Sequence, residues 1–187
     1  MEKLRREILI EVEKSLYTLD ERLKRDAKKV QKSLSKDIVL IIESIKRLQK
    51  ENKIGVIDSM VFVLSRVEID NNNFAYPVFL YGEKTYVDEY KTEFYLDVSS
   101  FYDCLKDIKE KALIISKKYI KEEISMPNIE NEIYRYLKYF NMNVVTELRK
   151  IFKDEKLLEL LKSLITTDSF VVIQNEIYEK PYNIFEK

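Results

Sequence analysis

Apolar residues recur at a helical spacing through residues 1–54, which contain neither glycine nor proline. From Leu4 to Leu48 they follow one another at about 3.67 residues per step, close to the 3.6 residues of an α-helical turn. They also form an eleven-residue repeat, which matches a nearly straight helix better than the seven-residue repeat of left-handed coiled coils. The pattern predicts one long amphipathic helix over residues 1–53, about 75 Å long at 1.5 Å per residue.

A helical hairpin is the alternative arrangement of this segment. It would turn at residues 33–37, with Ser35 capping the second helix. The apolar repeat passes through these residues in phase, and the usual turn residues Gly, Asn and Pro do not occur there. We therefore favour a continuous helix.

The pattern changes to that of β-strands between residues 58 and 98. Residues 60–69 are rich in β-branched side chains, residues 74–81 form a second apolar run, and residues 93–98 alternate apolar and polar positions. Turn residues separate these runs, so we expect a three-stranded antiparallel meander. Pro77 cannot donate a hydrogen bond, which suggests that the second strand lies at an edge or carries a bulge.

Helical spacing returns after residue 99, where Ser100 and Asp103 resemble a capping box. We expect helices over about residues 100–123, 128–153 and 154–166, the last capped by Asp154, and a short strand over residues 170–174 that joins the meander as a fourth strand. Pro181 suggests an irregular tail. The fold class is therefore α+β and predominantly helical: the long helix of residues 1–53, then a body over residues 54–187 with a three- to four-stranded antiparallel sheet and a C-terminal helical segment.

The composition excludes several kinds of catalytic and binding site. Without histidine, the chain has no Ser-His-Asp or Cys-His pair and no imidazole ligand for zinc. Cys104 is the single cysteine, which rules out an internal disulfide, and two glycines are too few for a Gly-rich nucleotide-binding loop. No cofactor is indicated. The charged N-terminus is unlike a signal peptide and no apolar run could span a bilayer, so we expect a soluble, cytoplasmic protein.

Charge is balanced over the whole chain, with 33 basic and 33 acidic residues, but it is unevenly distributed. Residues 1–53 carry a net charge of +5 and residues 54–98 a net charge of −5. Basic residues along the long helix could bind nucleic-acid phosphates, and two tyrosines in the aromatic and basic segment 134–140 could stack on bases. These candidate contacts are Arg22, Arg25, Lys28, Lys29, Lys32, Tyr134 and Tyr139. The ordinary explanation is a solvated helix face and boundary packing.

Carboxylates crowd the region of residues 83–97 and form the one group that could support catalysis. Without histidine, oxygen ligands alone could hold Mg²⁺ or Ca²⁺ there. The sequence does not show that these residues converge, so a metal-dependent enzyme is a second alternative, and we assign no catalytic residues and no metal ligands.

The leading hypothesis is a non-enzymatic interaction or adaptor protein. The long helix is expected to expose more apolar surface than the body can cover, and such a surface should meet another protein, most simply a second copy that forms a homo-oligomer. A nucleic-acid-associated regulator is the first alternative. The expected partner-binding residues are Ile8, Val12, Leu19, Leu23, Val30 and Leu34.

Overall fold

A computed structural model describes residues 2–65, 68–69, 71, 73–83, 89–117, 126–176 and 180–187. The chain forms two compact units. Unit 1 comprises Met1–Ala27 and Ser99–Val144, and unit 2 comprises Lys28–Val98 and Val145–Lys187. Both units draw on the first fifty residues, because one helix continues from unit 1 into unit 2.

That helix, α1 (Glu2–Lys50), confirms the predicted long N-terminal helix. It continues through residues 33–37, and both Leu34 in this segment and Ile38 just after it are buried. The alternative hairpin therefore does not form. The helix has a kink at Asp26, whose φ of −105° and ψ of 16° are not helical. Aspartate favours such local departures because its short polar side chain competes for backbone hydrogen bonds.

Unit 1 is helical in the part of the chain that the structure describes. Besides the first part of α1 it contains α3 (Ser99–Tyr102), α4 (Cys104–Ser116), α5 (Met126–Tyr134) and the first residues of α6 (Leu137–Ile151). The predicted helix 100–123 is therefore wrong at its start, where α3 precedes α4, and its end lies outside the described residues. The predicted helix 128–153 is broken at Arg135 and Tyr136 into α5 and α6.

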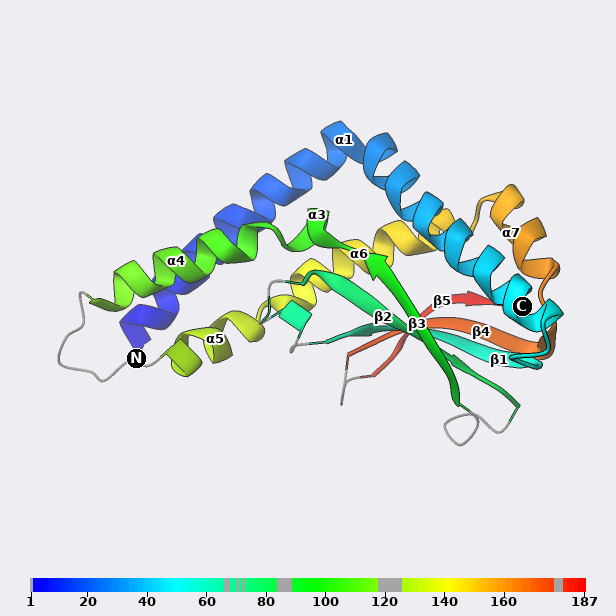
Figure 1. Ribbon diagram of the computed structural model, residues 1–187. Helices are drawn as coiled ribbons and strands as arrows, with labels where there is room; N and C mark the ends of the chain where they lie inside the picture. Colours follow the sequence, from blue (N-terminus) through cyan, green and yellow to red (C-terminus); the bar gives the residue numbers. More distant parts are fainter. Residues whose placement is uncertain are drawn as a thin grey trace. The chain divides into compact units, whose positions relative to one another are not determined.

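Unit 2 contains a five-stranded sheet (Figure 1). Its strands are β1 (Ile57–Leu64), β2 (Ala75–Tyr81), β3 (Glu89–Asp97), β4 (Thr166–Glu176) and β5 (Tyr182–Glu186), in the order β3-β2-β1-β4-β5. The predicted meander is confirmed, since β1 pairs with β2 and β2 with β3, both antiparallel. Pro77 lies in an interior strand rather than at an edge, and the β2–β3 register is irregular immediately after it, between Val78 and Leu80.

Two expectations about the C-terminal half of the sheet are wrong. The sheet is mixed rather than purely antiparallel, because β4 pairs parallel to β1. The C-terminal segment is also not helical: it ends in β4 and β5, and Pro181 precedes β5 rather than making the tail irregular. A proline before the first residue of a strand removes no hydrogen bond from the ladder, so it is compatible with the strand.

Helix α7 (Glu155–Lys162) begins as predicted at Asp154, whose Oδ1 accepts hydrogen bonds from the backbone N–H groups of Lys156 at 3.0 Å and Leu157 at 3.2 Å. Within unit 2, α7, the second part of α1 and the end of α6 all lie on the same face of the sheet (Figure 1). Phe62 of β1 contacts Phe152 at the end of α6, with ring centroids 6.3 Å apart. Among the described residues, no helix is both long enough and apolar enough to cross a membrane.

Candidate functional site

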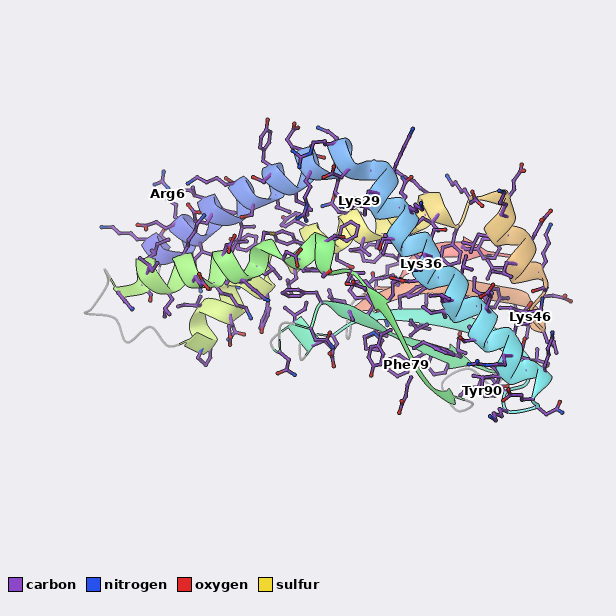
Figure 2. The ribbon with its side chains drawn as sticks, turned by 45° about the horizontal axis from the view of Figure 1, so that its top comes forward. Arg6, Lys29, Lys36, Lys46, Phe79 and Tyr90 are labelled. Atoms are coloured by element: carbon purple, nitrogen blue, oxygen red, sulfur yellow. The ribbon has the colours of Figure 1, made fainter. Side chains whose placement is uncertain are left out.

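The two faces of the unit 2 sheet differ in burial, although both carry apolar side chains. On the helix-covered face, Met60 and Phe62 are fully buried. On the other face, the strand register places Phe79 and Ile173 on either side of Val61. Phe79, labelled in Figure 2, and Ile173 are only half-buried, and no described helix of unit 2 lies over them (Figure 1). A sheet that is solvated on one side normally shows polar residues there, so this outer face is unusual.

We call this surface the open sheet face. It consists of Val61, Val63, Pro77, Phe79, Tyr95, Val171 and Ile173. With strands about 4.8 Å apart and about 3.3 Å per residue, five strands of six residues present roughly 480 Å² of flat area. That is smaller than the about 800 Å² per partner of a standard interface, and is of the size used by weaker, transient contacts.

Acidic side chains border the open sheet face at both edges of the sheet. Along β3, Glu93, Tyr95 and Asp97 alternate onto the same side, and all three are exposed. At the opposite edge Glu186 of β5 lies in register on this face, and its Oε2 accepts a hydrogen bond from Asn183 Nδ2 at 3.2 Å. An apolar centre with a polar rim is the usual anatomy of a protein interface.

A cleft of about 240 Å³ between α1 and β3 extends this surface past the edge of the sheet. Leu40 of α1 and Tyr95 of β3 line it and are 51% and 53% exposed. Asp37 also lines the cleft, and its pKa is raised, first by burial and then by the negative charge of Asp97. A cation placed beside β3 would therefore reduce the repulsion between the Asp37 and Asp97 carboxylates.

The six partner-binding residues predicted on the long helix lie mainly in the core. Five of them are buried, and Val30 is half-buried. The five buried residues are Ile8, Val12, Leu19, Leu23 and Leu34. Contacts through the five buried side chains would require the folded chain to open, whereas Val30 is partly accessible.

The predicted nucleic-acid contacts are divided between the two units. Lys28, Lys29 and Lys32 are exposed on the unit 2 part of α1; Lys29 is labelled there in Figure 2. Arg22 and Arg25 belong to unit 1. Arg22 is half-buried, and Arg25 is exposed with Nη2 lying 3.4 Å from an Asp26 carboxylate oxygen.

The two predicted stacking tyrosines belong to unit 1 as well. Tyr134 is half-buried, whereas Tyr139 is 48% exposed. The Tyr139 ring stacks on Tyr136 with centroids 6.4 Å apart, and Lys138 Nζ lies 5.2 Å from its centre. The two tyrosines therefore belong to a different unit from Lys28, Lys29 and Lys32.

The acidic region 83–97 does not form a metal site in the described part of the chain. Glu83 is exposed at a turn, and residues 84–88, including Asp88, lie outside the described residues. Glu93 and Asp97 lie on β3, and no cluster of three or more His, Cys, Asp or Glu side chains that could hold a metal ion occurs among the described residues.

Sequence analysis missed the open sheet face as a candidate site. Val61 and Val63 belong to the predicted strand 60–69, whose first half, residues 60–64, is apolar at every position and so on both faces, and Phe79 belongs to the predicted strand 74–81. The signal was present in this two-sided apolarity, which is typical of a strand covered on both faces. It could not be interpreted without knowing that α7, the second part of α1 and the end of α6 cover the same face.

No family model matches the chain, and no match was found among curated protein sequences or solved structures.

Proposed function

We propose that this protein is a non-enzymatic interaction protein whose open sheet face binds a basic amphipathic segment of another protein. The observation that carries the proposal is an apolar sheet face over which no described helix of unit 2 lies, opposite the face on which Met60 and Phe62 are fully buried. The apolar centre supplies the driving force through removal of half-exposed side chains such as Phe79, Val171 and Ile173 from water.

The acidic rim determines the charge of the partner. Glu93 and Asp97 on one edge and Glu186 on the other favour a segment that presents Lys or Arg on both sides of its apolar stripe, since complementary potentials speed association and select partners. A second copy docked face to face would bring like charges together at both edges. Self-association through the apolar residues of α1 stays a prediction, and the burial of five of them does not favour it.

A designed peptide pair tests the proposal. A Leu/Lys amphipathic helix of about five turns and its Leu/Glu counterpart, both fluorescently labelled, would be titrated with the full chain and followed by anisotropy. We expect the Leu/Lys peptide to bind and the Leu/Glu peptide not to bind. Tyr95→Ser should weaken binding by about tenfold, because truncating an aromatic residue that anchors an interface typically costs more than 1 kcal/mol.

Tyr17→Ser is the matched control, since Tyr17 of unit 1 is a 70% exposed tyrosine outside the open sheet face. Hydrogen exchange should show that the Leu/Lys peptide protects β1, β2 and β4. The proposal fails if Tyr17→Ser weakens binding as much as Tyr95→Ser, or if protection is confined to unit 1. If sedimentation experiments showed that the chain is a dimer and that Phe79→Ser dissociates it, the occupant of the open sheet face would be a second copy rather than a basic partner.

A nucleic-acid-binding function is the second candidate, and one observation on α1 favours it. Lys28, Lys29, Lys32 and Lys36 are exposed, and in the described part of the chain none of them has a carboxylate within ion-pair distance. Two other lysines of α1 are paired: Lys14 lies 2.7 Å from Glu11 and Lys24 lies 2.6 Å from Asp20.

Lys28 and Lys32 also line a cleft of about 270 Å³, together with Lys150 of α6 and Asp154. Phosphate binding by these side chains would depend steeply on salt. Binding of single- or double-stranded DNA at about 50 mM salt, lost in the Lys28→Gln/Lys32→Gln variant, would support this function. Binding that is absent, or that this variant leaves unchanged, would end it.

A further inference from the structure

A second surface of unit 2 is hollow and apolar, and it lies between α7 and the edge of the sheet that β5 forms. This pocket has a volume of about 290 Å³ and lies between α7 and strands β4 and β5. Its apolar walls are Leu158 and Leu161 from α7, Phe170 from β4 and Phe185 from β5. Leu161 and Phe170 are buried, whereas Leu158 and Phe185 are half-buried and face the space.

The walls of this pocket are held in place by neighbouring contacts. The Phe185 ring lies 6.4 Å from the Phe170 ring and 6.3 Å from the Phe152 ring, centroid to centroid. The backbone N–H of Lys187 donates to Phe170 O at 3.1 Å, which fixes β5 against β4. Because these walls are held in place and do not close the pocket, the atoms that line it lack dispersion contacts on the side that faces the space. A ligand with a matching apolar part would restore these contacts.

The charged residues at this pocket favour an anionic group on that ligand. Lys162 and Lys187 both line the pocket and both are exposed. Lys187 Nζ donates to Thr166 Oγ1 at 3.1 Å and to Thr167 O at 3.4 Å. These acceptors are neutral, so they orient the ammonium group without cancelling its charge. Glu186 also borders the pocket, and its carboxylate accepts from Asn183.

We propose that the pocket binds a straight-chain aliphatic carboxylate, with the chain among Leu158, Leu161, Phe170 and Phe185 and the carboxylate between Lys162 and Lys187. The length follows from the volume. At about 30 Å³ per water-sized group, the pocket accommodates roughly ten non-hydrogen atoms, which is the size of octanoate. The pocket volume of about 290 Å³ is close to the lower limit of the range for small-molecule sites, about 300–1,000 Å³.

Calorimetric titration of the full chain with octanoate, hexanoate, octanol and octylamine tests the ligand class. We expect octanoate to bind about tenfold more tightly than hexanoate, because two buried methylenes contribute about 0.8 kcal/mol each. Octanol should bind more weakly than octanoate, and octylamine should show no measurable binding. Equal affinities for octanoate and octanol would overturn the role of the two lysines.

Variants test the location. Lys162→Gln and Lys187→Gln change exposed side chains and should each reduce the preference for octanoate over octanol by at least threefold. Lys156→Gln is the matched control: it removes an exposed lysine from the same helix, outside the pocket lining. Leu158→Phe narrows the pocket and should abolish octanoate binding while the melting temperature is retained. The proposal is overturned if octanoate binds Leu158→Phe undiminished, or if Lys156→Gln has the same effect as the pocket lysines.

Discussion

Gln49 offers the sharpest test of how unit 2 is held together, because its buried side chain joins the end of α1 to the residues that precede two strands, β1 and β4. Its Nε2 donates to Gly55 O and Ile165 O, both at 2.8 Å, and its Oε1 accepts from the Ile165 backbone N–H at 3.0 Å. The side chain is 5% exposed. These bonds connect the residues just before β1 and β4, so Gln49 fixes where the parallel pair begins.

The loss of stability expected for Gln49→Leu follows from counting the backbone groups that lose a hydrogen-bond partner. Three hydrogen bonds at about 1 kcal/mol each give an upper value near 3 kcal/mol. Ile165 O retains a hydrogen bond from Ile57 N at 3.1 Å, and the exposed Gly55 can bond water. We therefore expect a loss of about 2 kcal/mol in the free energy of unfolding of unit 2, equivalent to about 4–8 °C in melting temperature for a chain of this size.

The assay is urea denaturation followed by circular dichroism, with hydrogen exchange to assign the loss to β1 and β4. Gln49→Glu is the informative second variant: it keeps the acceptor but places a carboxylate against two carbonyl oxygens, so it should be destabilised at pH 7 and recover in acid. Lys50→Leu, an exposed neighbour on α1, should stay within about 0.5 kcal/mol of the original chain. A Gln49→Leu variant as stable as Lys50→Leu would refute the reasoning.

Two further predictions concern titratable groups. The pKa of Asp37 is raised by burial and by Asp97, so the protonated form is favoured in the folded state, and its contribution to stability is present in acid and lost as the pH rises through the raised pKa. Asp37→Asn should therefore stabilise unit 2 at pH 7 and show no advantage below the ordinary carboxyl range; urea midpoints measured across this range check it, and an advantage that persists in acid contradicts it. Burial raises the pKa of Cys104 to about 11, so at pH 8 the fraction of Cys104 in the thiolate form is about a hundredfold lower than in the urea-unfolded chain, and Cys104 should react more slowly with a disulfide reagent when folded; equal rates would contradict this.

The local parts of the fold could be predicted from sequence, and the non-local parts could not. Helix α1 follows from an apolar spacing that no glycine or proline interrupts, and the start of α7 follows from Asp154, whose side chain forms the expected cap. Each of these signals lies within a few residues. The parallel pairing of β1 with β4 joins Val61 to Ile173, residues far apart in the chain, and nothing in either strand's own pattern specifies that partner.

The candidate site depends on non-local contacts, which could not be predicted from the sequence. The buried positions of α1 were recognised correctly as apolar, but whether they meet another protein or the chain's own core depends on tertiary packing. Conversely, Phe79 and Ile173 read as ordinary strand residues, and they form one surface only because the register brings them beside Val61. A functional surface of this type is visible only after the helices have been assigned to one face of the sheet.

The chain crosses between the two units three times: in α1 after Ala27, between β3 and α3 after Val98, and in α6 after Val144. A truncation that isolates one unit would therefore cut α1 beside its kink at Asp26 and cut α6 in its interior, and each cut would expose a helix end with unsatisfied backbone groups. Neither unit is a separable module that could be moved by recombination or expressed alone without new caps.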